Sequence, residues 1–421
     1  MEKDVIKQII LRQQDFISQV RLLPRELEIE ANGNYVFIGI RRAGKTYLLY
    51  QYIQELLRDG HIKQEILFIN FEDERIADIR KDELYLLLEC YKELFAYDPI
   101  IFLDEIQNVE GWEHFARRLA DEKRRVFITG SNARMLSREI ASTLGGRYLM
   151  KEVYPFDFSE YLRYHQVRLE EHWELSPTRA DVVRLFEDYF YNGGLPESFD
   201  YLDKRTWLTS LYQKILYSDI VVRNNIRNER SLRLLVRKLA DSVLQPMAVK
   251  RLQNILQGDG SRISRETVAA FLDYLHGAYL TFGISNFTET VSQRKTTKKT
   301  YFYDNGLLNL FLFRPETKLL ENLVAITLYK RYGEELYYYN KSVEVDFFVP
   351  AQGLAVQVSY ALQDEQTRRR EVGALIALSR FMPLRRILII CKDQEEVLEE
   401  GNLRIEVVPV WKWLLKTNLF Q

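Results

Sequence analysis

The sequence predicts an α/β protein organised around a parallel sheet, and three observations support this prediction. Short apolar runs of strand length alternate with helical stretches between residues 35 and 153. A glycine-rich loop separates the first apolar run from the helix that follows it. The chain has 421 residues, which exceeds what one compact core usually holds, so we expect two or three domains.

The composition excludes several classes of protein. Hydrophobic residues make up 47% and aromatic residues 13% of the chain, which is too much for a disordered protein. The 59 Lys and Arg residues are balanced by 60 Asp and Glu residues. This balance excludes a uniformly basic wrapper of nucleic acid but is compatible with a local basic face.

We expect a soluble cytoplasmic protein with no membrane segment. No apolar run reaches the roughly 18–20 residues that a membrane span requires. The N-terminal segment MEKDVIKQIILRQQDF lacks the apolar region and cleavage site of a signal peptide. Cys90 and Cys391 have no CxxC spacing, which excludes a disulfide scaffold or a cysteine metal site and favours a reducing compartment.

The elements of the N-terminal part follow from hydrophobic periodicity. Apolar residues at helical spacing predict a helix over residues 5–20. Strands are expected at 35–39, 65–71, 100–104, 125–129 and 147–153, with helices at 45–58, 81–95 and 112–122. The apolar runs are nearly continuous, as is typical of parallel strands covered on both faces.

The rest of the chain is predicted to form three further parts. Residues 156–222 are expected to be helical, and residues 231–303 to form three helices and two strands (279–286 and 299–303), the outline of a winged helix. After Pro315, helices at 319–332 and 365–378, strands at 335–339, 344–350, 354–359 and 386–391, and a final strand–helix pair predict a small α/β domain. The expected domains are therefore 1–155, 156–222, 223–314 and 315–421.

The segment from Gly39 to Thr46 is the strongest indication of chemistry. It fits GxxxxGK[ST] at every fixed position and lies between a predicted strand and a predicted helix. In such a loop, backbone N–H groups and the helix N-terminus bind phosphate. Lys45 is expected to reach the β- and γ-phosphates, and Thr46 to ligate Mg²⁺. The expected nucleotide contacts are Gly39, Arg41, Arg42, Ala43, Gly44, Lys45, Thr46 and Tyr47.

Two acidic residues follow the apolar strand predicted at 100–104. Asp104 and Glu105 end the run IIFLDE, which is the Walker B form. The carboxyl end of a buried parallel strand faces the crevice in which ligands bind. We expect Asp104 to hold Mg²⁺ through water and Glu105 to polarise the attacking water.

Further candidates follow the strand at 125–129. In Gly130-Ser131-Asn132, Ser131 or Asn132 is expected to sense the γ-phosphate or to position the nucleophilic water, with a structural turn as the alternative, and Asn132 is taken as the candidate. Arg134, Arg138 and Arg147 are candidates for an arginine finger, with surface arginines as the alternative. Arg147, in Gly145-Gly146-Arg147, is preferred.

These motifs resemble those of a known family. The runs GIRRAGKT, IIFLDEIQ, ITGSNARML, STLGGRY and YPFDFSEYL resemble predicted ATPases of the AAA+ superfamily, in the bacterial and archaeal subgroup with a C-terminal domain of unknown function. The resemblance continues through YNGGLPESF, YSDIV, YFYDNGL, ENLVA and EVDFFV. It implies an ATP-binding core with a helical lid, Walker A residues Lys45 and Thr46, and Walker B residues Asp104 and Glu105. It also implies Mg²⁺-dependent ATP hydrolysis and makes a homo-oligomer plausible, because AAA+ proteins often use an arginine of a neighbouring subunit.

The predicted winged helix suggests duplex DNA as a partner. Basic residues cluster in two groups, Arg223, Arg227, Arg230, Arg233, Arg237 and Lys238 before or within its first helix, and Arg294, Lys295, Lys298 and Lys299 in the expected wing. Wing residues of this kind contact DNA phosphates while a helix enters the groove. The alternative is a nucleotide-gated switch in which this module packs against a protein partner.

The last domain has the residue order of a PD-(D/E)xK nuclease. Glu321 is predicted on a helix, and Glu344 and Asp346 on a strand. The following E-x-K position contains Gln357-x-Ser359, which lacks both a carboxylate for the metal and the lysine. We interpret the domain as a nuclease-like fold that has lost its chemistry, with an ATP-dependent nuclease as the less favoured alternative.

Overall fold

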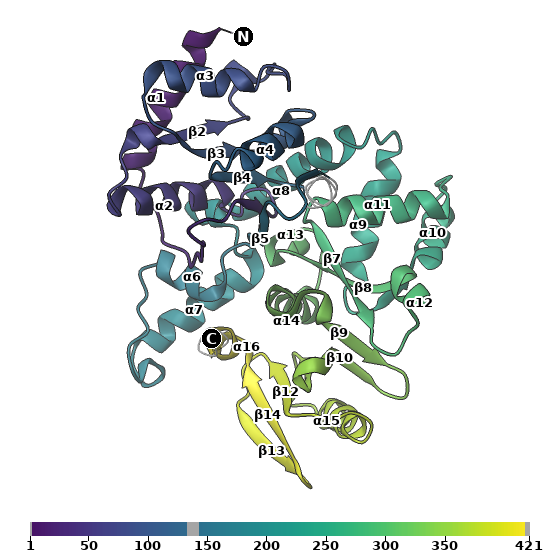
Figure 1. The fold of residues 1–421 in the computed structure, drawn as a ribbon. Helices are drawn as coiled ribbons and strands as arrows, with labels where there is room; N and C mark the ends of the chain where they lie inside the picture. The colour runs from purple at the N-terminus through teal and green to yellow at the C-terminus, as the bar shows by residue number, and fades with distance from the viewer. Residues whose placement is uncertain (1, 133–142, 417–421) are drawn as a thin grey trace. The chain divides into compact units, whose positions relative to one another are not determined.

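A computed structural model describes residues 2–132 and 143–416. The chain divides into two compact units (Figure 1). The N-terminal unit is Met1–Tyr154 with Gly277–Tyr279, and the C-terminal unit is Pro155–His276 with Leu280–Gln421. Among the described residues, no helix is long and apolar enough to cross a membrane.

The N-terminal unit contains the parallel sheet that the sequence predicts. Its strands are β1 (Tyr35–Ile38), β2 (Ile66–Asn70), β3 (Ile100–Asp104), β4 (Val126–Gly130) and β5 (Leu149–Glu152). They are arranged in the order β2-β3-β4-β1-β5, and every pair is parallel. The carboxyl ends of β1, β3 and β4 therefore meet at one edge of the sheet, with β4 in the middle.

In the described part of this unit, four α-helices accompany the sheet. They are α1 (Lys3–Gln19), α2 (Lys45–Arg58), α3 (Tyr85–Leu94) and α4 (Trp112–Asp121). Helix α1 buries Ile6, Ile9 and Ile17, and the Gln14 amide donates to the Ile66 carbonyl over 2.7 Å, which fixes the helix beside β2. Helix α3 begins later than the predicted residue 81, because residues 81–84 form a turn.

The C-terminal unit begins with helices, as expected. They are α6 (Phe158–Tyr164), α7 (Thr178–Asn192), α8 (Lys204–Lys214), α9 (Glu229–Asp241), α10 (Val249–Gly258) and α11 (Arg265–Gly277). Helix α8 continues into a π-helical segment, Ile215–Val222. Asp157 caps α6 by accepting from the Glu160 N–H over 2.9 Å, and Glu160 reciprocates by accepting from the Asp157 N–H.

One nine-stranded sheet runs through the rest of this unit. Its strands are β6 (Pro246–Ala248), β7 (Thr281–Asn286), β8 (Thr297–Phe302), β9 (Tyr337–Asn340), β10 (Glu344–Val349), β11 (Leu354–Ser359), β12 (Arg386–Cys391), β13 (Glu396–Glu400) and β14 (Leu403–Pro409). Strands β7 and β9 pair in parallel through Ser285 opposite Tyr337 and Asn286 opposite Tyr338. The expected domains 223–314 and 315–421 thus share one sheet within one compact unit, and the division between them stays a prediction.

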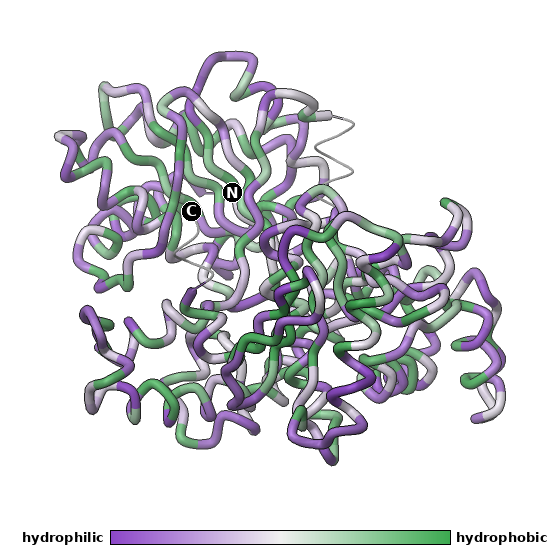
Figure 2. Tube along the Cα trace, turned by 90° about the horizontal axis from the view of Figure 1, so that it is seen from below, coloured by the Kyte–Doolittle hydropathy of each residue, from purple (hydrophilic) through white to green (hydrophobic). Residues whose placement is uncertain are grey.

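The remaining helices of the unit connect or flank these strands. They are α12 (Val291–Thr296), α13 (Asn305–Asn309), α14 (Glu316–Tyr332), α15 (Glu365–Ser379) and α16 (Val410–Lys416). The predicted final strand–helix pair contains an additional strand, because β13 and β14 form an antiparallel pair before α16. In the trace of Figure 2, hydrophobic stretches, drawn green, alternate along the chain with hydrophilic stretches, drawn purple.

Helices α7, α13 and α14 are joined by a buried polar cluster. Asp304 caps α13 and accepts hydrogen bonds from the Leu307 N–H over 3.1 Å and the Gly194 N–H over 2.8 Å. Gly193 has φ +77°, and a Cβ there would lie 2.2 Å from Asp304 Oδ1, so only glycine fits. The Asn305 amide donates to the carbonyls of Phe190 and Leu319, at 3.0 and 3.1 Å.

Candidate nucleotide-binding site

The glycine-rich loop lies between β1 and α2, as predicted. Gly39 has φ +156°, and a Cβ there would lie 2.1 Å from the Val153 carbonyl oxygen. No side chain fits at this position, because the Val153 N–H also donates to the Ile38 carbonyl over 2.7 Å and holds the two segments together. Gly44 forms the N-cap of α2. Arg42 adopts the left-handed backbone conformation, with φ 66°, which is uncommon for a residue other than glycine. The loop is therefore held in a curved conformation.

The Lys45 ammonium lies buried inside this loop. It donates to the carbonyls of Gly39 and Ile40, each over 3.1 Å, and lies 3.6 Å from Glu105 Oε1. Its side chain is 3% exposed. The loop's own carbonyls and a carboxylate thus satisfy the ammonium.

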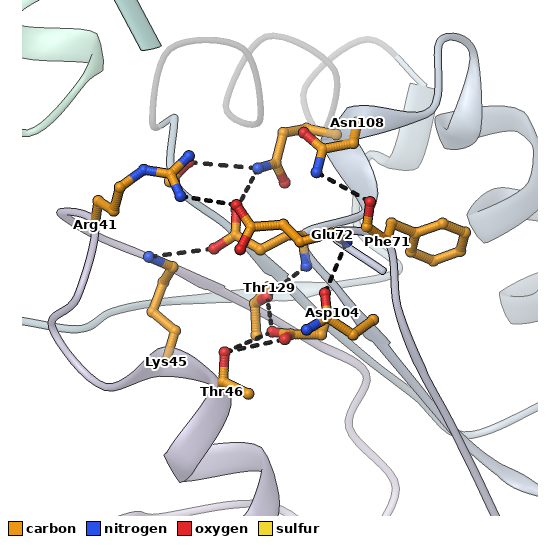
Figure 3. Close-up of polar contacts among 12 residues, drawn as sticks. Arg41, Lys45, Thr46, Phe71, Glu72, Asp104, Asn108 and Thr129 are labelled. Atoms are coloured by element: carbon orange, nitrogen blue, oxygen red, sulfur yellow. Dashed lines mark hydrogen bonds and ion pairs between the residues drawn. The ribbon is translucent and has the colours of Figure 1, made fainter. Parts of the chain in front are cut away.

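Two side chains from two elements converge on the Asp104 carboxylate, as Figure 3 shows. Thr46 of α2 donates to both carboxylate oxygens at 3.0 Å, and Thr129 of β4 donates to Oδ1 at 2.6 Å. Thr129 Oγ1 also accepts from the Glu105 N–H over 2.9 Å. Burial and the nearby Glu105 charge raise the pKa of Asp104 to about 7, against the opposing effects of both threonines and Lys45.

Glu105 is held by its neighbours in a conformation unusual for a non-glycine residue, with φ 52°. Gln107 donates to the Glu105 carboxylate and, over 3.4 Å, to Ser131 Oγ. Burial alone would raise the pKa of Glu105, but the charges of Lys45 and Arg41 and the bond from Gln107 hold it below its usual value. Glu105 is therefore an ionised carboxylate in a closed polar network.

The other predicted contacts lie around this centre. Ala43 is buried in the loop, and the Arg41 guanidinium lies 2.7 Å from Glu72 Oε1. Tyr47 is 55% exposed on the first turn of α2. Asn132 is buried and lies two residues after the end of β4, the strand between β1 and β3. All of these residues lie at the carboxyl edge of the sheet.

Arg147 is not brought to this edge. Strands β1 and β5 are parallel, with Tyr35 opposite Leu149, so Arg147 precedes β5 at the amino edge. Four strand residues separate the two edges, a distance of about 10 Å or more. The Arg147 guanidinium pairs instead with Asp121 over 2.6 Å. Arg134 and Arg138 lie outside the described residues.

The structure also reveals three site residues that the sequence analysis missed. Thr129 and Gln107 contact the Walker B residues, and Arg25 donates to the carbonyls of Ala43 and Tyr154, each over 3.1 Å. The sequence offers a signal for two of them. Thr129 is a polar residue at the end of an apolar strand, and Gln107 lies two residues after Glu105. Arg25 carries no motif that could have identified it.

The structure corrects the prediction that Lys299 and Arg294 lie on an exposed DNA-binding wing. Lys299 is fully buried, and the half-buried Arg294 donates to the carbonyls of Phe287 and Glu289. Both side chains therefore have partners within the C-terminal unit. Lys299 lies on β8, which pairs with β7, and Arg294 of α12 lies over the ring of Tyr337 on β9. The exposed basic residues of the first group are Arg227, Arg230, Arg233 and Arg237.

Family models match two segments of the chain. A family model described as an AAA domain matches residues 31–162, and a domain of unknown function (DUF8612) matches residues 183–318. The uncharacterized protein MJ1544 of Methanocaldococcus jannaschii is 32% identical, covering 98% of this chain and 96% of that protein. An uncharacterized protein of Haemophilus influenzae is 30% identical, covering 90% and 94%.

Among solved structures, the Walker-type ATPase PABY2304 of Pyrococcus abyssi is similar over 74% of this chain and 95% of that chain. The two are 15% identical in sequence, with a TM-score of 0.39.

Proposed function

We propose that this chain, which belongs to the same family as MJ1544, binds and hydrolyses ATP with Mg²⁺. Residues 31–162 match the AAA domain, and the glycine-rich loop carries the groups that bind phosphate. The observation that supports this proposal is the convergence of Lys45, Thr46, Asp104 and Glu105 at one edge of the sheet. Each residue has the chemistry that phosphoryl transfer to water needs.

The loop and Lys45 bind the phosphates. Backbone N–H groups of residues 40–46 and the N-terminal end of α2 supply partial positive charge. On ATP binding, the Lys45 ammonium exchanges the carbonyls of Gly39 and Ile40 for phosphate oxygens. Because the ammonium is already buried, this exchange costs little further desolvation.

The donor set around Asp104 fits a hard divalent cation. A hydroxyl and a carboxylate, from Thr46 and Asp104, lie together at 3.0 Å, and such oxygen donors suit Mg²⁺. When bound, Mg²⁺ neutralises charge that develops on the phosphate oxygens. Thr129 holds the Asp104 carboxylate in place and favours its ionised form.

Glu105 prepares the water that attacks the γ-phosphate. In the nucleotide-free state its carboxylate is paired with Lys45 and Gln107. Transfer of Lys45 to the phosphates leaves Glu105 with an unpaired charge and a free oxygen to accept a proton from water. Ser131 and Asn132 follow the adjacent strand and orient the γ-phosphate and the water.

Two variants test this assignment. Lys45→Ala should abolish ATP binding, and Glu105→Gln, which keeps the shape but removes the base, should bind ATP and lose about 10²–10⁴-fold in turnover. Steady-state hydrolysis and nucleotide titration measure the two effects. Lys63→Ala, which removes an exposed lysine paired with Asp15, is the control for charge alone. Equal turnover by Glu105→Gln and the unaltered chain would refute the role of Glu105.

We further propose that ATP turnover acts on the C-terminal unit as a switch for a cytoplasmic partner. Duplex DNA is favoured by the exposed Arg227, Arg230 and Arg237 near α9, whereas the inward use of Lys299 and Arg294 favours a protein. Residues 156–222 act as the lid and residues 223–314 as the winged helix. The Arg147 side chain lies at the edge of the sheet opposite the phosphate-binding loop of the same chain, and it serves the nucleotide site of a neighbouring subunit in a homo-oligomer.

Stimulation of ATP hydrolysis by duplex DNA distinguishes these partners, with Lys45→Ala as the blank. A DNA-binding chain should lose affinity steeply as salt rises, because bound phosphates release counterions. Replacing Arg227, Arg230 and Arg237 together by alanine should reduce that salt dependence. Hydrolysis that ignores DNA at all salt concentrations would leave a protein as the partner.

A further inference from the structure

A buried lysine lies at the centre of the carboxylates that the sequence analysis singled out in the last domain. The Lys299 side chain, on β8, is 1% exposed. Its ammonium lies 3.1 Å from Glu344, 3.4 Å from Asp346 and 3.6 Å from Glu321. Strand β10 supplies Glu344 and Asp346, and helix α14 supplies Glu321. Three elements therefore meet at one ammonium group.

Other polar groups fix these carboxylates in place. Glu321 accepts from the Tyr301 hydroxyl over 2.7 Å, and Asp346 accepts from the Val358 N–H over 3.0 Å. Gln357, which stands at the expected carboxylate position of the nuclease motif, accepts from the Asp346 N–H over 2.7 Å. The arrangement is thus built of oriented side chains rather than of acidic residues that happen to be neighbours.

The residues present do not fit a divalent cation. A metal ion held by Glu321, Glu344 and Asp346 would lie about 2.0–2.6 Å from their oxygens. It would therefore lie close to the Lys299 ammonium, which contacts the same oxygens. Burial alone would lower the pKa of Lys299, but the charges of Glu321, Asp346 and Glu344 raise it above its usual value. The repulsion between metal and ammonium persists, because the lysine stays protonated.

We propose that the Lys299 ammonium takes the place of a divalent cation in this carboxylate centre, closes the centre to metal, and ties β8 to α14 and β10. The centre then performs no metal-dependent cleavage of nucleic acid. It joins the strand of the predicted wing to the strands of the predicted nuclease-like part, across the expected boundary at residue 314. This inference does not depend on ATP hydrolysis.

The test uses Mn²⁺ as the probe, with the full chain free of nucleotide. Mn²⁺ suits carboxylate ligands and reports its binding by paramagnetic resonance. We expect the unaltered chain and Asp346→Asn to bind Mn²⁺ equally, since any binding at Asp104 is common to both. Metal binding by the unaltered chain that Asp346→Asn removes would overturn the proposal.

A second arm removes the ammonium. Lys299→Ala leaves buried carboxylates without a counter-charge, so its Tm should fall by about 10 °C. Millimolar Mn²⁺ should restore much of the lost Tm, and Lys299→Ala should bind one more Mn²⁺ ion per chain than the unaltered protein. Adding Asp346→Asn to this variant should abolish both effects. Lys298→Ala, the half-buried neighbour on β8, is the matched control and should show no Mn²⁺ effect.

The two arms decide the proposal independently. A folded Lys299→Ala chain that gains no affinity for Mn²⁺ would overturn the view that the ammonium stands where a cation fits. If Lys299→Ala does not fold, the comparison between the unaltered chain and Asp346→Asn still decides whether the centre is closed to metal.

Discussion

Replacement of Thr129 by valine tests how Asp104 and Glu105, the acids of the proposed ATPase site, are held. Valine has nearly the same shape, but it cannot donate to Asp104, now 2.6 Å away, or accept from the Glu105 N–H, now 2.9 Å away. The side chain is fully buried, so water does not replace either bond. Thr129→Ser keeps the hydroxyl and is the matched control.

The magnitude follows from these two bonds. A hydrogen bond to a charged group contributes about 1.5–3 kcal/mol, and an unpaired buried N–H costs about 1–3 kcal/mol. The free energy of unfolding of the N-terminal unit should therefore fall by about 2.5–6 kcal/mol. A melting curve should show the loss in Thr129→Val and much less of it in Thr129→Ser.

The same change should alter the pH dependence of hydrolysis. Asp104 must be ionised to hold Mg²⁺, and its pKa is already raised to about 7 by burial and Glu105. Loss of the Thr129 bond raises that pKa further, so activity is lost at a higher pH as the solution is acidified. A bond of about 1.5–3 kcal/mol corresponds to a displacement of about 1–2 pH units.

The assay is kcat/KM for ATP against pH, which reports ionisations of the free enzyme. Thr129→Val should show its acid limb moved toward alkaline pH, whereas Thr129→Ser should follow the unaltered chain. Identical melting temperatures and pH profiles for the two variants would refute the account of Thr129.

Three further predictions concern other parts of the chain. Gly39→Ala should abolish ATP binding, because its Cβ would lie 2.1 Å from a carbonyl oxygen beside β5; Gly60→Ala, also at positive φ but with nothing within 4 Å, should keep binding in the same titration. Arg147→Ala should leave ATP affinity unchanged, since this residue lies at the opposite edge of the sheet; a large loss of affinity would contradict the placement. Burial raises the pKa of Asp304 to about 6, so its contribution to stability is present below about pH 4 and is lost as the pH rises through 6. The Tm of the unaltered chain relative to Asp304→Asn should accordingly increase from pH 7 to pH 5, and a constant difference would count against this ionisation.

The phosphate-binding half of the site was predictable because its chemistry is local in sequence. The loop from Gly39 to Thr46 and the acids at Asp104 and Glu105 each lie at the end of an apolar strand. Strand direction alone then places both at one edge of a parallel sheet. The same rule places Arg147, which precedes its strand, at the opposite edge of the sheet, and its role as an arginine finger stays a prediction.

Contacts between distant residues were not predictable in this way. Arg25 reaches Ala43 and Tyr154 through long-range packing, and no spacing in the sequence marks it. Lys299 follows other basic residues in the sequence, which predicts a solvent-exposed wing, whereas the packing of α14 on β8 brings it to Glu321. Charge in a sequence shows that a residue needs a partner but not whether that partner is solvent, phosphate or a buried acid.

The cluster around Asp304 determines where this chain can be cut. A fragment ending at residue 222 would retain α7 but lose the Asp304 carboxylate that accepts from Gly194 and the Asn305 amide that donates to Phe190. The Gly194 N–H would then lose its buried partner, and α7 would lose the helices α13 and α14 that pack against it. Dissection of the protein should therefore separate residues 1–154 from the remainder, and keep the helices after residue 155 with the sheet that follows them.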